Sequence, residues 1–200
     1  MRRGGKDMEE IVFVTHNKGK VASANKHFKD IKFQIYEYEL DEPRSDDVGE
    51  ISRSKVKEAY DLVKKPCIAL DCGFFIPALN GFPRAFVNFA LDTIHLDGIL
   101  KMMEGKENRE CYFLECLSYY DGVKVKQFFG KQEGKLATKI LGEDTNEKWS
   151  DLWYIYIPQG SEKTLAQMTR EERDHRKKNE NEKRNSTLMM FSEWYQNREK

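Results

Sequence analysis

The sequence has no long apolar run, no excess of one charge and no closely spaced pair of cysteines. A membrane-spanning helix needs about 18 or more consecutive apolar residues. No run here is near that length, so we expect no membrane partner. The opening MRRGGKDMEE is basic but lacks the apolar stretch of a signal peptide. We therefore expect residues 1–8 to form a disordered arm and residues 9–200 a single domain.

The balance of charge argues against a protein dedicated to binding nucleic acid. The chain has 34 lysines and arginines and 34 aspartates and glutamates, which gives a formal net charge of zero. A protein dedicated to nucleic acid needs a positive excess to neutralise phosphates. We therefore expect no nucleic-acid partner, and any basic site must be local.

Cysteine is scarce, and its spacing is not that of a metal site. The four cysteines form no CxxC pair and have no histidine partner at metal-ligand spacing: Cys67, Cys72, Cys111 and Cys116. Disulfides and zinc ligation are the alternatives, but the pattern favours reduced thiols in the core of a cytoplasmic protein. The predicted location is the cytoplasm.

What the sequence does contain is an alternation of strand and helix patterns. Strands are predicted at 11–15, 31–38, 66–71, on both sides of the Asp121-Gly122 turn, and at 153–158. Helices are predicted from Lys18, over 45–63, in two stretches that end near Ile94 and Met103, and over 185–195. The charged segment 170–184 is a solvated helix or a mobile loop. This order predicts an α/β domain, with a mixed β-sheet flanked by helices.

The segment VTHNKGK, residues 14–20, stands where the first predicted strand ends and the first helix begins. Thr15, Asn17 and Lys20 would lie at the N-terminus of that helix. Backbone N–H groups and the helix dipole favour an anion there, and lysine adds full charge. The spacing is not that of a P-loop. A plain surface turn is the alternative.

Two acids lie beside other predicted strands. Glu42 stands too far upstream to cap the helix over 45–63, whereas Asp46 or Asp47 suits that cap. Asp71 ends the apolar run CIALD, where a carboxylate can hold a metal, act as a base, or hydrogen-bond the following loop. Two carboxylates beside a basic loop suit Mg²⁺ bound to a polyphosphate, because this hard cation takes oxygen ligands.

Several motifs follow one another in a set order over residues 9–195. They are IVFVTHNKGK, LDE, GEISRSKVKEA, DCGFFIPALNGFPR, FFGKQEGKL and KTLAQMTREER. In order and spacing they resemble the TxNxxK, LPE, EEIaxxKxxxA, DTGLxxxALxGxPG, FxGxxxGxI and KTxAEMxxEEK motifs of the inosine triphosphate pyrophosphatase family. Agreement across this many motifs is far more specific than any one of them.

The resemblance implies a hydrolase that converts deaminated purine nucleoside triphosphates to monophosphate and pyrophosphate. It implies a homodimer, with two lobes around a central nucleotide cleft in each chain. It makes Asp71 and Lys55 catalytic, and gives Glu42 and Asp71 to a bound Mg²⁺. The residues that it puts in contact with the substrate are Thr15, Asn17, Lys20 and Arg173.

The motifs that read the base depart from this family. The family's FGWDP falls on SDLWY, and its SHR falls on EKR, of which only Arg184 matches. Trp153 and nearby Trp149 could stack on a base, or lie in the core as aromatic residues beside strands often do. We expect Arg184 and Trp153 to contact the substrate, while the preference for inosine or xanthine stays open.

A nucleotide-binding or regulatory protein that keeps the fold without turnover is the alternative function. Leu70, which stands where the family has a carboxylate, and the missing SHR favour that alternative. The presence of Glu42, Lys55 and Asp71 favours the enzyme.

Overall fold

The structure is a computed structural model that describes residues 10–28, 31–144, 148–177 and 185–198. The arm predicted at residues 1–8 lies outside these ranges. Within them, every helix is too short or too polar for a membrane span.

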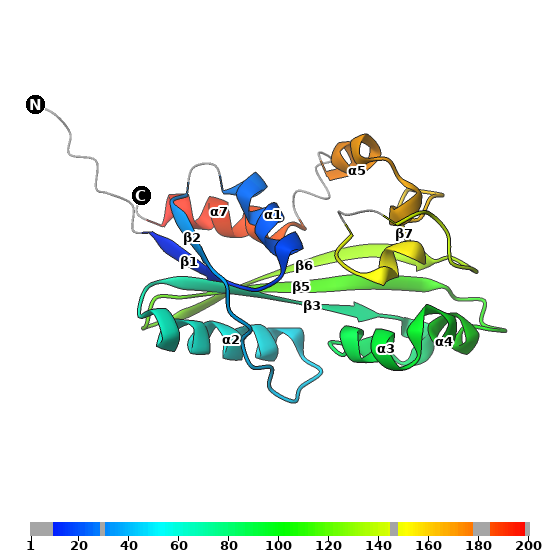
Figure 1. The fold of residues 1–200 in the computed structure, drawn as a ribbon, viewed down its shortest axis with the longest axis horizontal. Helices are drawn as coiled ribbons and strands as arrows, with labels where there is room; N and C mark the ends of the chain where they lie inside the picture. The colour runs from blue at the N-terminus through cyan, green and yellow to red at the C-terminus, as the bar shows by residue number, and fades with distance from the viewer. Residues whose placement is uncertain (1–9, 29–30, 145–147, 178–184, 199–200) are drawn as a thin grey trace, which may run out of the picture.

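The described residues form one mixed sheet of seven strands (Figure 1). The strands are β1 Ile11–Val14, β2 Phe33–Tyr36, β3 Cys67–Phe75, β4 Pro83–Arg84, β5 Glu110–Tyr120, β6 Val125–Leu136 and β7 Tyr156–Pro158. Their order is β2-β1-β3-β5-β6-β7, with β4 beside β3. β1 pairs in parallel with β2 and β3, and the other pairs are antiparallel. The predicted fold class is therefore confirmed.

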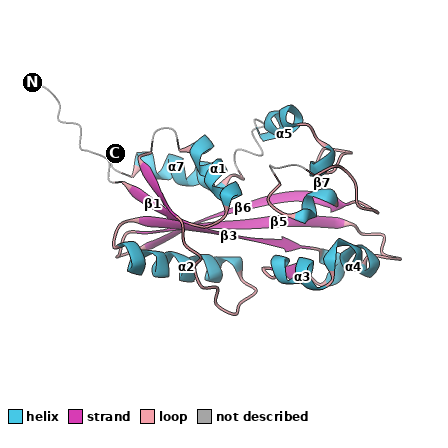
Figure 2. Ribbon diagram, in the orientation of Figure 1, coloured by secondary structure: helices cyan, strands magenta, loops and turns pink. Residues whose placement is uncertain are grey.

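Helices cover both faces of this sheet (Figure 2). On one side lie α1 Lys18–His27, α5 Arg170–Lys177 and α7 Thr187–Asn197, and on the other α2 Val48–Val63, α3 Val87–Thr93 and α4 His95–Met102. Short 3-10 helices are η1 Pro77–Leu79, η2 Asp151–Tyr154 and η3 Leu165–Gln167. The charged segment predicted at 170–184 begins as α5, and its residues 178–184 lie outside the described ranges.

Local signals explain why α2 forms where the sequence predicts it. Asp47 is its N-cap, and Asp47 Oδ1 accepts from the backbone N–H of Gly49 at 2.7 Å and of Glu50 at 3.1 Å. The inner face of α2 is buried at Ile51 and Ala59. Helical spacing would put Leu62 on the same face, but Leu62 is 43% exposed. Val63, one position on, packs against the core instead.

Three apolar clusters hold the layers together. The α7-side cluster contains, among others, Ile11, Phe13, Leu70, Leu117 and Phe191. The β7-side cluster contains, among others, Phe74, Ile99, Leu152 and Tyr156, with Phe113 packed against it. The α2-side cluster contains, among others, Val12, Val14, Val56 and Ala69. β1 contributes to two clusters on opposite faces, which is why its four residues are all apolar and buried.

The pairing of β3 with β5 corrects the predicted end of one strand. The strand predicted to end at Asp71 continues to Phe75, because every residue from Cys67 to Phe75 finds a partner on β5. Side chains alternate along a strand. Asp71 therefore shares a face with Ala69, toward α2, and Cys72 shares the opposite face with Leu70.

Other predictions agree with the structure to different degrees. The hairpin between β5 and β6 turns where the sequence predicts, and Asp121 Oδ1 accepts from Val123 N and Lys124 N, each at 2.9 Å.

The strand predicted at 153–158 begins only at Tyr156, because the preceding residues form η2, which Ser150 caps. All four cysteines are free thiols, three of them buried and Cys72 half-buried.

Candidate active site

Helix α1 begins with a capped turn directly after β1. Thr15 Oγ1 accepts from the backbone N–H of Asn17 at 3.1 Å, and Asn17 Oδ1 accepts from the backbone N–H of Lys20 at 3.1 Å. Thr15 and Asn17 thus shape the turn, which is the role that the plain-turn alternative gives them. The first turn of α1 carries no acid, so its positive dipole end is not neutralised locally.

Trp149, which comes much later in the sequence, lies against this turn. A Cβ added to Gly19 would stand 2.5 Å from Trp149 Cδ1, so the close approach of the indole ring requires glycine there. Trp149 is 42% exposed. Of the two tryptophans that could stack on a base, this one lies beside the first turn of α1.

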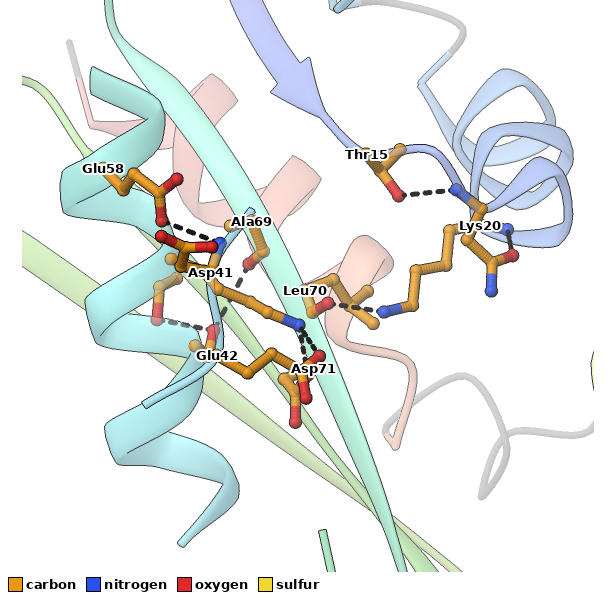
Figure 3. Close-up of polar contacts among 12 residues, drawn as sticks. Thr15, Lys20, Asp41, Glu42, Glu58, Ala69, Leu70 and Asp71 are labelled. Atoms are coloured by element: carbon orange, nitrogen blue, oxygen red, sulfur yellow. Dashed lines mark hydrogen bonds and ion pairs between the residues drawn. The ribbon is translucent and has the colours of Figure 1, made fainter. Parts of the chain in front are cut away.

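Lys20 extends from that turn to β3. Its Nζ donates to the backbone oxygen of Leu70 at 2.6 Å (Figure 3). Burial lowers the pKa of Lys20, and the charge of Asp71 opposes that shift. A poorly solvated ammonium group is stabilised by a nearby anion, so this lysine is suited to hold a phosphate.

Lys55 joins two acids that come from different segments. Its Nζ donates to Asp71 Oδ1 at 2.9 Å and also to Glu42 Oε1 (Figure 3). Lys55 and Asp71 are buried, whereas the side chain of Glu42 is 58% exposed. Burial lowers the pKa of Lys55, but Asp71 and Glu42 outweigh it and hold the pKa above its ordinary value.

The contacts that position these groups have no obvious sequence signal. Asp41 N donates to Glu58 Oε2 at 3.0 Å, which ties the loop that carries Glu42 to α2. Ser52 Oγ donates to Ser118 Oγ at 2.8 Å and so links α2 to β5. Sequence reasoning missed all four residues. Only Glu58 could have been noticed, because it follows Lys55 by three positions on one helix.

The four charged groups converge on one short stretch of β3. Lys20 from α1 and Lys55 from α2 reach β3 at the neighbouring residues Leu70 and Asp71, and Figure 3 shows Lys20 beside Leu70. Two lysines suit an anion, and two carboxylates suit a hard cation. Among the described residues, no group of three or more His, Cys, Asp or Glu side chains could hold a metal ion. A metal bound by Glu42 and Asp71 would therefore complete its coordination with other oxygens, such as those of phosphate or water.

Two other residues predicted to contact the substrate, Trp153 and Arg173, lie elsewhere. Trp153 is 9% exposed and belongs to the β7-side cluster. The Arg173 guanidinium stands 5.4 Å from the Trp153 ring and donates to the backbone oxygens of Leu165, at 3.4 Å, and Met168. Arg173 is buried, and these contacts lie within the lobe that carries η2 and η3. Arg184 lies outside the described residues.

A hollow of about 390 Å³ lies away from these charged groups. Its lining comes mainly from β5, β6 and β7, and includes Tyr112, Lys131, Glu133, Lys135 and Glu162. Its charged side chains pair with one another, as Lys131 with Glu133 at 2.7 Å and Lys135 with Glu162 at 3.5 Å. We place the candidate active site at Asp71 and not in this hollow, because buried, convergent charges define a reactive site better than volume does.

Comparison with known proteins identifies the family to which this geometry belongs. The model of the Ham1 family matches residues 11–194, which include β1, the lysines and both acids. The chain belongs to the Ham1 family. The Ham1 assignment agrees with the resemblance drawn from the motifs.

Individual Ham1 relatives match over almost their whole length. The chain is 33% identical over 186 residues to a dITP/XTP pyrophosphatase of Thermococcus kodakarensis, covering 92% of this chain and 96% of that one. It is 34% identical over 180 residues to one of Saccharolobus solfataricus, covering 87% and 88%. The Ham1 protein structure from Staphylococcus aureus superposes with a TM-score of 0.75 at 22% identity, covering 95% and 100%. The HAM1 protein structure from Coxiella burnetii superposes with a TM-score of 0.78 at 18% sequence identity, covering 93% of this chain and 98% of that one.

Proposed function

We propose that the chain hydrolyses deaminated purine nucleoside triphosphates, such as dITP and XTP, to the nucleoside monophosphate and pyrophosphate. The observation that carries the proposal is the convergence of Lys20, Lys55, Glu42 and Asp71 on one stretch of β3. The substrate class comes from the names of the relatives, which are dITP/XTP pyrophosphatases.

The residues divide the chemistry between them. Lys20 and the N-terminal turn of α1 bind phosphate oxygens, with the turn held in shape by Thr15 and Asn17. Lys55 neutralises charge that moves onto the leaving pyrophosphate, where a preorganised ammonium is most effective. The Asp71 carboxylate accepts the proton of the attacking water, and Lys55 orients that carboxylate by fixing its position.

Mg²⁺ fits the donor set on the side of Lys55. Both carboxylates contact the same ammonium, so their oxygens already lie close together around one positive centre. Mg²⁺ takes one or two carboxylates together with phosphate oxygens and water. When bound by Glu42 and Asp71, the ion would polarise the phosphate that is attacked.

The other predicted substrate contacts have less support. Arg173, Trp153 and Arg184 stay predictions for substrate contact. A role for Arg173 would require its guanidinium to leave the backbone oxygens of Leu165 and Met168. The homodimer and the cytoplasmic location are likewise predictions that follow from the family resemblance and from the cysteine pattern.

The experiment that tests the proposal is pyrophosphate release over a panel of purine and pyrimidine triphosphates, with and without Mg²⁺. The proposal predicts release from dITP and XTP that stops when the metal is chelated. Tight dITP binding without turnover of any triphosphate would instead support the nucleotide-binding alternative.

A further inference from the structure

The strand β5 carries an acid that the proposed chemistry does not use. Glu115 pairs across the sheet with Cys72 on β3 and with Gly130 on β6. On the same face, the rows on either side are apolar. Leu70 and Leu117 belong to the α7-side cluster, and Phe74 and Phe113 pack in the β7-side cluster. We call Cys72, Glu115 and Gly130 the polar row, since it separates the two clusters.

Glu115 binds the first residue of α7. Thr187 is fully buried, and its hydroxyl donates to Glu115 Oε1. The two residues are 72 positions apart in the sequence, so this bond joins β5 to the C-terminal helix. An acid at a helix N-terminus is also stabilised by the helix dipole.

Gly130 lets the chain before α7 lie directly on the sheet. A Cβ at Gly130 would stand 2.1 Å from the backbone oxygen of Asn185 and 3.1 Å from Thr187 Cγ2. A side chain there would therefore lift the start of α7. The glycine and the Glu115–Thr187 hydrogen bond act together to fix residues 185–187 against β5 and β6.

This fixed point lies beside the phosphate end of the candidate active site. Burial raises the pKa of Glu115, and the Thr187 hydroxyl and the Lys20 ammonium both oppose that shift. Glu115 also lies one strand away from Leu70, whose backbone oxygen accepts from the Lys20 ammonium. Cys72, across from Glu115, directly follows Asp71. A nucleotide whose phosphates lie at Leu70 and Asp71 must extend its nucleoside away from them, and the Glu115–Thr187 bond brings the start of α7 to the strand beside these two residues.

We propose that Glu115 is a positioning residue for the nucleoside part of the substrate. Through Thr187 it holds the start of α7 on the polar row, beside the lysine that takes the phosphates. The inference rests on the proposed function for its substrate. It assigns Glu115 no contact with the reacting atoms.

The test compares a nucleotide with a ligand that lacks a nucleoside. Thr187→Val removes the hydroxyl donor at nearly constant volume, and Thr187→Ser keeps it. Glu115→Ala removes the acceptor, and Glu115→Gln keeps an oxygen that can accept. For each variant, KM and kcat are measured with dITP, and Ki with inorganic tripolyphosphate, both in Mg²⁺.

Thr187→Val and Glu115→Ala should raise KM for dITP about tenfold or more, since small displacements of a binding wall are costly. The Ki for tripolyphosphate should change less than about twofold in the two Thr187 variants, because they leave the charge beside Lys20 unchanged and that ligand meets only the phosphate end. Thr187→Ser and Glu115→Gln should remain close to the parent.

An unchanged KM in Thr187→Val would overturn the inference, even if its urea midpoint fell, because the bond would then serve stability alone. Equal losses for dITP and tripolyphosphate would also overturn it. If the parent fails to turn over dITP, the proposed function fails separately. Calorimetric binding of dITP and tripolyphosphate to the same variants then still decides the inference, since binding needs no turnover.

Discussion

At the scale of single residues, the position of one carboxylate matters most. Asp71 is buried, and its Oδ1 accepts from the Lys55 ammonium at 2.9 Å. An unpaired carboxylate would be costly at such a position, so the lysine and the acid stabilise each other. The ion pair therefore holds the Asp71 carboxylate in a fixed position, which a proton acceptor requires.

Replacing Asp71 with asparagine keeps the shape of the side chain and removes its charge. We expect kcat for dITP to fall by about 10² or more in Asp71→Asn, because both proton acceptance and metal binding would be lost. The measurement is steady-state pyrophosphate release, with the circular dichroism spectrum as the control for folding. Turnover near the parent rate in a folded Asp71→Asn variant would remove Asp71 from the mechanism.

Lys20 offers a matched pair of substitutions. Lys20→Ala should raise KM for dITP much more than it raises Ki for dIMP, because the lysine serves the outer phosphates in our proposal. Lys18→Ala is the control, since Lys18 lies in the same turn of α1 and is exposed. Equal effects of Lys20→Ala on the two ligands, or equal effects of the two substitutions on KM, would return Lys20 to the class of surface lysines.

At the scale of elements, the site is assembled by α1, α2 and β3. Each of these elements has a local reason to form where it does: α1 and α2 have side-chain caps, and β3 is apolar from Cys67 to Leu70. Lys20 from the first turn of α1 and Lys55 from the middle of α2 then reach one stretch of strand. The positions of Lys20 and Lys55 therefore depend on where α1 and α2 begin.

The cap of α2 can be tested without touching the chemistry. Asp47→Ala should lower the free energy of unfolding by about 1 kcal/mol, because two backbone N–H groups lose their acceptor. Asp46→Ala is the neighbouring control and should cost less than about 1 kcal/mol, since Asp46 makes a half-exposed ion pair with Arg84. Urea denaturation measures both, and an equal loss in the two variants would contradict the assigned cap.

At the scale of the whole molecule, the sequence predicted the fold class, and it singled out Lys20, Lys55, Glu42 and Asp71, which the structure brings together. Those features depend on local patterns, such as a strand followed by a capped helix, and on motifs that stay in order. The length of β3 could not be predicted, because its last residues pair with β4 and β5, which come later in the sequence. The Arg173–Trp153 contact and the Glu115–Thr187 bond were missed for the same reason: they join distant segments that carry no local signal.

Base preference is also a property of the whole molecule, since the segments that replace the family's base-reading motifs are far in sequence from Lys20, Glu42 and Asp71. The family's WDP and SHR residues are replaced here, and a site without those partners rejects the wrong base poorly. Matched polar groups give discrimination of about 10⁴-fold when fully used. We predict a ratio of kcat/KM for dITP over dATP below about 10³. A larger ratio would show that the altered segments still read the purine carbonyl.

The most direct test of the central claim is the fate of the water oxygen. The parent protein is given dITP and Mg²⁺ in water labelled with heavy oxygen, and the products are analysed by mass spectrometry. If the charged groups at Asp71 direct water to the α–β linkage, one labelled dIMP forms for each unlabelled pyrophosphate, without orthophosphate. Formation of dIDP and orthophosphate, or label in the pyrophosphate, would contradict the account.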